Sequence, residues 1–233
     1  MKRNGIDTRR YDIKQLTVEF TLPKPGTTYT MHPGQVVPQL NISTEPLGRC
    51  TIELLARGKD RNEITRNISE VMGMLSKPAI LELDGYKGKY YGILVASKET
   101  KMQVPQRFRL HLEFDGYLMD TPVTIKFPPG STCGTCHRVG SRSMPCCLIL
   151  DPERDIDSIS IQGVGKLPII VENLTAGHKV TIDGTTGLIT QDGASKAPDV
   201  TMWTLPAMIS EEMTLTWDSP DVSVSVIYTP AWL

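Results

Sequence analysis

Residues 51–75 read TIELLARGKDRNEITRNISEVMGML, a strand pattern that passes directly into a helix pattern. Residues 51–57 suit a short β-strand. In the part that follows, apolar residues recur at steps of four, three and four, which places them on one face of a helix. These residues are Ile64, Ile68, Val71 and Leu75. The pattern predicts a helix that packs its apolar stripe on a sheet.

The two ends of this helix carry residues that favour helix termini. Asp60 can accept a hydrogen bond from a free backbone N–H of the first turn, and Glu63 can close a capping box. Pro78 stops the helix beyond Leu75, because proline has no N–H to donate. The sequence holds no other strong helix pattern, so the rest of the chain is expected to be mainly β.

Strand patterns surround the helix in the first half of the chain. Residues 16–22 alternate apolar and polar side chains, which predicts a strand with one buried face. The apolar positions on that face are Leu16, Val18, Phe20 and Leu22. Further strands are expected at residues 79–83, 90–96 and 107–114, with a hairpin turn at Asp84-Gly85. The first half is therefore predicted to be an α+β or sandwich-like unit with one helix across its sheet.

The second half shows short strand patterns separated by turn residues. Strands are expected near residues 159–161, 169–171, 180–182, 188–189, 213–217 and 222–228. No helix pattern follows residue 150, and the spacing of the turns indicates a small all-β sandwich. Between the halves, residues 126–145 are dominated by Pro, Gly, Ser and Cys without periodicity, which predicts a linker. The predicted division is thus 1–125, 126–145 and 146–233.

The composition excludes several classes of protein. The chain has 233 residues, 39% of them hydrophobic and 22% charged, with a formal net charge of −1. Such a balance is typical of a globular protein and gives no general attraction to nucleic acid. No secretory signal and no apolar run of transmembrane length is present, so we expect a chain made in the cytoplasm, without membrane contact or specific nucleic-acid recognition.

Short motifs along the whole chain resemble the distal tail protein of siphoviruses, the Dit family. In the first half they are NGID at residues 4–7, the strand 16–22, HPG at 32–34, IELLARGKDRNEI at 52–64, KYYG at 89–92 and LEFD at 112–115. In the second half they are IQG at 161–163, LTAG at 174–177, TID at 181–183 and YTPAWL at 228–233. Each motif alone is weak evidence. Together, however, the motifs follow the order of that family over nearly the full length of the chain.

The resemblance implies a structural protein of the virion tail tip rather than an enzyme, and it implies no cofactor. In that family the first domain forms a homo-hexameric ring around a channel, and a galectin-like β-sandwich lies outside it. The implied partners are copies of the chain itself, the major tail tube protein, a tail-associated lysin or fibre hub protein, and the tape-measure protein. The tape measure and then DNA would pass through the channel. An alternative is a carbohydrate-binding module for the host surface.

Four cysteines form the one constellation with possible metal chemistry. They are Cys133, Cys136, Cys146 and Cys147. Four thiolates can surround zinc, but adjacent Cys146 and Cys147 would point to opposite faces of a strand. The sequence therefore leaves three states open for these cysteines: a zinc site, a disulfide and free thiols. Because the spacing does not favour zinc, we predict no metal site. Haem attachment at CGTCH, residues 133–137, requires export and is disfavoured.

Other candidate residues have simpler explanations. Trp203, Trp217 and Trp232 could stack on sugars, although Trp217 alternates with Leu215 as a core residue would. Residues 163–166 (GVGK) lack the glycine and the hydroxyl residue of a phosphate-binding loop. The histidines are scattered, and no local sequence suggests a catalytic set.

Two loops are candidates for contacts between copies. These are the proline-rich residues 23–33 and the turn at residues 84–89, both expected to project from the first sheet.

Overall fold

The structure is a computed structural model that describes residues 1–22, 27–30, 39–42, 47–102, 104 and 106–232. The chain divides into two compact units. Unit 1 comprises Met1–Asp120 together with Trp232 near the end of the chain, and unit 2 comprises Thr121–Ala231. β4 (Thr27–Thr30) and β5 (Gln39–Ile42) form a separate two-stranded antiparallel sheet. None of the described helices is long and apolar enough to cross a membrane.

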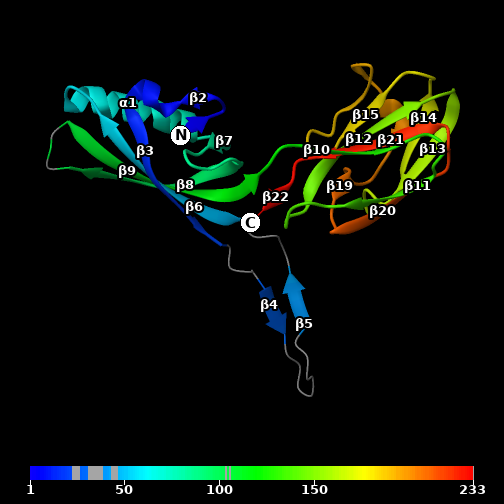
Figure 1. Cartoon of the computed structure of the whole chain (residues 1–233), viewed down its shortest axis with the longest axis horizontal. Helices are drawn as coiled ribbons and strands as arrows, with labels where there is room; N and C mark the ends of the chain where they lie inside the picture. The colour runs from blue at the N-terminus through cyan, green and yellow to red at the C-terminus, as the bar shows by residue number, and fades with distance from the viewer. Residues whose placement is uncertain (23–26, 31–38, 43–46, 103, 105, 233) are drawn as a thin grey trace. The chain divides into compact units, whose positions relative to one another are not determined.

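Unit 1 is an eight-stranded sheet with α1 lying across one face (Figure 1). The strand order is β2-β1-β7-β8-β9-β6-β3, and β22 pairs with β9. The strands are β1 (Lys2–Arg3), β2 (Ile6–Asp7), β3 (Ile13–Thr21), β6 (Gly48–Arg57), β7 (Ala79–Glu82), β8 (Lys89–Lys101), β9 (Arg107–Met119) and β22 (Ala231–Trp232). The three strands predicted after the helix are confirmed as β7, β8 and β9, the last two longer than predicted.

The predicted helix is confirmed as α1 (Arg61–Leu75). The Asp60 side chain accepts a hydrogen bond from the backbone N–H of Glu63 at 2.8 Å, which caps the first turn. The Glu63 carboxylate accepts from the backbone N–H of Lys59 at 2.7 Å, one residue before the position a capping box uses. The four stripe residues Ile64, Ile68, Val71 and Leu75 are all buried in the core between helix and sheet. The second layer of unit 1 is thus this helix.

A β-bulge corrects one prediction about β3. Pairing with β6 shifts register between Gln15 and Thr17, which makes Leu16 the extra residue. Val18 and Phe20 pack against the core as predicted, but Leu16 is exposed, and Leu22 lies past the strand end and is exposed too. Strict alternation fails here because one inserted residue reverses which side chains face the core.

A row of glycines lies near one end of the sheet, and Gly92 leaves room there for the Tyr90 ring. Gly92, Gly116 and Gly48 are directly opposite one another on β8, β9 and β6. A Cβ atom on Gly92 would come within 2.9 Å of the Tyr90 ring. The Tyr90 hydroxyl donates to the carbonyl oxygen of Gly48 at 3.1 Å, with the carbonyl oxygen of Phe114 also in range at 3.3 Å. Burial raises the pKa of Tyr90, which keeps the hydroxyl a donor.

Unit 2 is a two-layer β-sandwich, as predicted. One sheet contains β10 (Val123–Phe127), β12 (Met144–Pro152), β15 (Val180–Asp183), β16 (Ile189–Gln191), β17 (Ala194–Ser195), β19 (Ala207–Met208) and β21 (Val222–Tyr228). The other contains β11 (Cys133–His137), β13 (Ile156–Gln162), β14 (Ile169–Leu174), β18 (Val200–Thr201) and β20 (Glu212–Trp217). Alternate residues of both sheets, such as Leu148 and Val224 against Ile161 and Leu215, fill one shared core.

The linker predicted at residues 126–145 is wrong. β10 ends at Phe127 and pairs with β21, and β11 pairs with β20 along all five of its residues. β11 was not recognisable as a strand because its sequence, CGTCH, has a single buried residue, Cys136. Its place in the sheet comes from backbone hydrogen bonds to β20 rather than from an apolar pattern.

Candidate interaction surfaces

The four cysteines of the second half do not converge on one site, although Cys136 and Cys146 are buried in the same core. Cys133 and Cys136 are three residues apart on β11, so one is exposed and the other is buried in the sandwich core. Cys146 and Cys147 are adjacent on β12, where Cys146 is buried and Cys147 is half-buried. All four thiols are free. Across the described residues, no group of three or more His, Cys, Asp or Glu side chains is placed to hold a metal ion.

Burial lowers the reactivity of three of these four thiols. Desolvation raises the pKa of Cys146 to about 12 and also raises the pKa of Cys136. For Cys147, desolvation and then the nearby Asp183 carboxylate raise the pKa. Because the thiolate is the reactive species, a raised pKa and poor access both slow its chemistry.

We expect the native protein to show one fast thiol, Cys133, in a titration with Ellman's reagent. Cys147 should react more slowly, and Cys50, Cys136 and Cys146 should react only after unfolding in guanidinium, because they are buried. The substitution Cys133→Ser should remove the fast phase without changing the slower reaction of Cys147. Rapid reaction of a third thiol in the native protein would contradict this placement of the cysteines.

The three tryptophans lie in different surroundings. Trp217 is 3% exposed and packs in the core beside Phe127, with ring centroids 5.6 Å apart. Its indole N–H is buried without a hydrogen-bond partner in the described part of the chain. Trp232 is half-buried in β22. Trp203 is 80% exposed, so of the three it alone offers an open ring face.

The remaining motifs do not assemble a catalytic or phosphate site. Val164, inside the GVGK motif, is buried in the core, and the element directly after the motif is the strand β14, not the helix that a phosphate-binding loop needs. His178 lies 2.5 Å from a carboxylate oxygen of Asp192, and His137 lies 4.0 Å from Glu212. His111 is exposed on β9. His32 lies outside the described residues.

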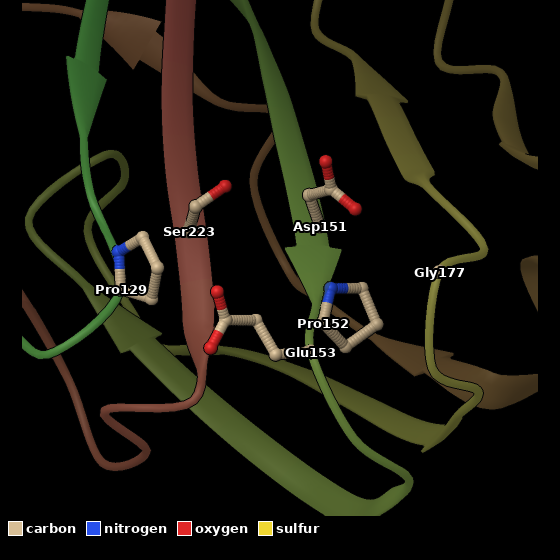
Figure 2. A pocket seen from close by; sticks show the side chains of 6 residues that line it. All are labelled: Pro129, Asp151, Pro152, Glu153, Gly177 and Ser223. Carbon is tan, nitrogen blue, oxygen red and sulfur yellow. The ribbon is translucent and has the colours of Figure 1, made fainter.

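A shallow hollow of about 460 Å³ opens on unit 2 (Figure 2). It is lined by Pro129, Asp151, Pro152, Glu153, Gly177 and Ser223. The Asp151 carboxylate is ion-paired with Lys179 at 3.1 Å, whereas Glu153 has no ion-pair partner in the described chain. One paired and one unpaired carboxylate do not supply the ligand set of a metal or a poised acid and base.

The face of the unit 1 sheet opposite α1 breaks the expected pattern of polar residues. Ile80 of β7 stands opposite Tyr91 of β8, and Tyr91 stands opposite Tyr117 of β9. The two tyrosine rings stack with centroids 5.2 Å apart. Ile93 is adjacent on β8 and is 39% exposed, while Ile80 is 37% exposed. We call these four residues the tyrosine patch.

Charged residues border the tyrosine patch. Arg49 of β6 forms ion pairs with Asp115 at 2.9 Å and with Glu113 at 3.1 Å, both on β9. An apolar and aromatic centre with a charged border is typical of a surface that another protein covers. The patch was missed from sequence, although apolar residues at both odd and even positions in residues 90–95 are a signal that both faces of that strand are apolar.

The turn after β7 is firmly anchored. Asp84 binds the Met1 amino group at 3.2 Å and the Arg9 guanidinium at 2.8 Å. Partial burial opposes ionisation of the Asp84 carboxyl, but the amino group and Arg9 outweigh it and lower its pKa. Gln15 exchanges two hydrogen bonds with the Asp84 backbone, at 2.9 and 3.0 Å. Of the two loops proposed for contacts between copies, this one is rigidly held and presents Tyr86, while residues 23–33 lie largely outside the described part.

Comparison with known proteins gives a match in structure but not in sequence. No protein-family model and no curated protein matches the chain. The crystal structure of SPP1 Dit, described as a paradigm of the hub adsorption apparatus in phages that infect Gram-positive bacteria, aligns with a TM-score of 0.75. The alignment covers 99% of this chain and 98% of that one at 10% identity. This chain has the fold of SPP1 Dit.

The Dit fold therefore accounts for both units and not for one alone. A chain from the phage P2 baseplate in its activated conformation with Ca aligns less closely, with a TM-score of 0.50 over 96% of this chain and 92% of that one, at 9% identity. The resemblance inferred from short motifs is confirmed at the level of the fold. The low identity explains why each motif was weak alone.

Proposed function

We propose that this protein is the distal tail protein of a long-tailed phage or prophage, a structural and non-enzymatic hub of the tail tip. The observation that carries the proposal is the alignment with SPP1 Dit over both full lengths at a TM-score of 0.75. Matching over the whole chain matters because the likeness then covers both units, and the alignment leaves only 1% of this chain uncovered.

The proposed work of the protein is geometric. Copies of the chain form a ring, of six subunits as the Dit resemblance implies, with contacts in which one surface of each copy fits a different surface of the next. The ring joins the tail tube to a lysin or fibre hub protein and leaves a channel for the tape-measure protein and DNA. Unit 2 serves as the galectin-like domain. The protein resides in the virion tail.

The tyrosine patch supports contacts between copies. A ring of this kind needs apolar surfaces whose removal from water is favourable, and the partly exposed Ile80 and Ile93 on this sheet face meet that need. The stacked tyrosines add a rigid aromatic area that loses little conformational entropy on binding.

Light scattering over a range of concentrations, followed by negative-stain imaging, tests the proposal. We expect a closed ring of about six copies with an open centre. The substitutions Ile80→Lys and Ile93→Lys should reduce the mass to that of the monomer, because each buries an unpaired charge at the contact. Both residues are partly exposed in the single chain, so the fold itself should survive.

A matched control is Ile209→Lys, since Ile209 is 48% exposed and lies on unit 2. This variant should assemble as the native chain does. Rings from both patch variants would show that the copies do not meet through the tyrosine patch. Monomers at every concentration would contradict ring formation by the chain alone.

The second candidate function is binding of host-surface carbohydrate, for which the open ring of Trp203 is the favouring observation. A glycan array probed with the intact chain distinguishes the two candidate functions, because a hub protein that binds no carbohydrate gives no signal.

A further inference from the structure

One corner of the unit 1 sheet gathers positive charge on the face that carries the tyrosine patch. The rows of opposite residues there are Thr100–Arg109–Leu55–Lys14, then Arg107–Arg57, and next to them Lys98–His111–Glu53. Lys14, Arg57, Lys98, Arg107 and Arg109 are all exposed. We call these five residues the basic corner. The whole chain, by contrast, has a formal net charge of −1.

Few carboxylates neutralise the basic corner. Arg109 pairs with Glu53 at 3.5 Å. Asp12 lines a hollow of about 150 Å³ together with Arg9, Ile13, Lys14 and Arg57, and Arg9 is itself engaged by Asp84. Within the described residues, Lys14, Arg57, Lys98 and Arg107 have no ion-pair partner at 4.0 Å or less. Five cations thus face two carboxylates.

The pairing of Arg57 with Arg107 works against the fold. The two residues are directly opposite on β6 and β9, where like charges repel and destabilise a sheet. Leu55, which lies between Arg109 and Lys14, is only 8% exposed, so side chains already cover it. Departures from the local rules of sheet design are expected at functional or strained sites.

We infer that the basic corner binds a carboxylate-rich segment of another protein. Guanidinium groups match carboxylates with two parallel hydrogen bonds, and the hollow beside Lys14 and Arg57 can admit one carboxylate. Nucleic acid fits less well. Its continuous row of phosphates would cross Asp12 and Glu53, and the near-neutral chain lacks the long-range attraction of nucleic-acid-binding proteins. This inference depends on charge alone and does not require the proposed ring.

Fluorescence anisotropy with a labelled peptide of glutamates tests the inference, using the full chain at low ionic strength. The triple variant Lys14→Gln, Arg57→Gln and Arg107→Gln should bind this peptide about tenfold more weakly than the native chain. The matched control, Lys77→Gln, Lys87→Gln and Lys89→Gln, removes the same charge from exposed lysines outside the corner and should bind within about twofold of native.

Thermal unfolding of both variants shows whether they are folded, and removal of the Arg57 and Arg107 repulsion should not lower the midpoint. An equal loss of peptide affinity in the control would overturn the inference, because charge anywhere would then suffice. So would an absence of peptide binding by the native chain. Tighter binding of a labelled DNA duplex than of the peptide would overturn it too and assign the corner to nucleic acid instead.

Discussion

Replacing Trp217 by alanine should lower the free energy of unfolding of unit 2 by about 3–5 kcal/mol. The side chain is 3% exposed and lies in the core between the two sheets, in contact with Phe127. Removing it takes away a large apolar area and leaves a cavity that the surrounding strands can fill only in part. Chemical denaturation followed by circular dichroism measures the change.

Two variants serve as controls for this prediction. Trp203→Ala removes the same side chain from an 80% exposed position and should change stability by no more than about 0.5 kcal/mol. Trp217→Phe keeps an aromatic ring and removes an indole N–H that has no described partner, so it should cost far less than alanine. Equal effects of Trp217→Ala and Trp203→Ala would contradict the placement of Trp217 in the core.

The substitution Gly116→Ala should destabilise unit 1 by about 3 kcal/mol, although it adds a single methyl group. An added Cβ would lie 1.8 Å from the carbonyl oxygen of Tyr91, on the neighbouring strand β8. That oxygen belongs to the backbone, so no side-chain rotation relieves the clash, and β8 and β9 would have to separate. Thermal unfolding followed by calorimetry measures this loss of stability.

Gly73→Ala is the matched control. Gly73 lies in α1, and an added Cβ there would meet no atom within 4 Å. Alanine favours a helix over glycine by about 1 kcal/mol, so this variant should be slightly more stable than the native chain. A Gly116→Ala protein as stable as native would mean that β8 and β9 are not as close as the structure has them.

Local patterns in the sequence were sufficient for the helix and for most strands. α1 was predicted with its cap and its buried stripe because each depends on residues within a few positions of one another. The core strands β9 and β21 were predicted because one face of each is buried and alternates cleanly. By contrast, β11 could not be predicted, since its position depends on backbone bonds to β20, about 80 residues away.

The composition of the candidate sites depended more on tertiary structure than the helix and strands did. The sequence placed four cysteines within 15 residues of one another, but strand geometry alternates their side chains and scatters them between core and surface. The tyrosine patch and the basic corner each combine residues from three or four strands, whose neighbours in space are set by pairing and register.

The sequence by itself therefore determined the secondary structure of the well-patterned segments, the mainly β class and, through motifs in a fixed order, the resemblance to Dit. Only the tertiary structure decided which residues share a surface, where the chain divides into two units, and which side chain the bulge at Leu16 turns outward. The physical reason is the distance along the sequence over which each kind of interaction acts. Caps and periodicity act over a few residues, whereas strand order, register and surface composition arise from contacts between distant segments.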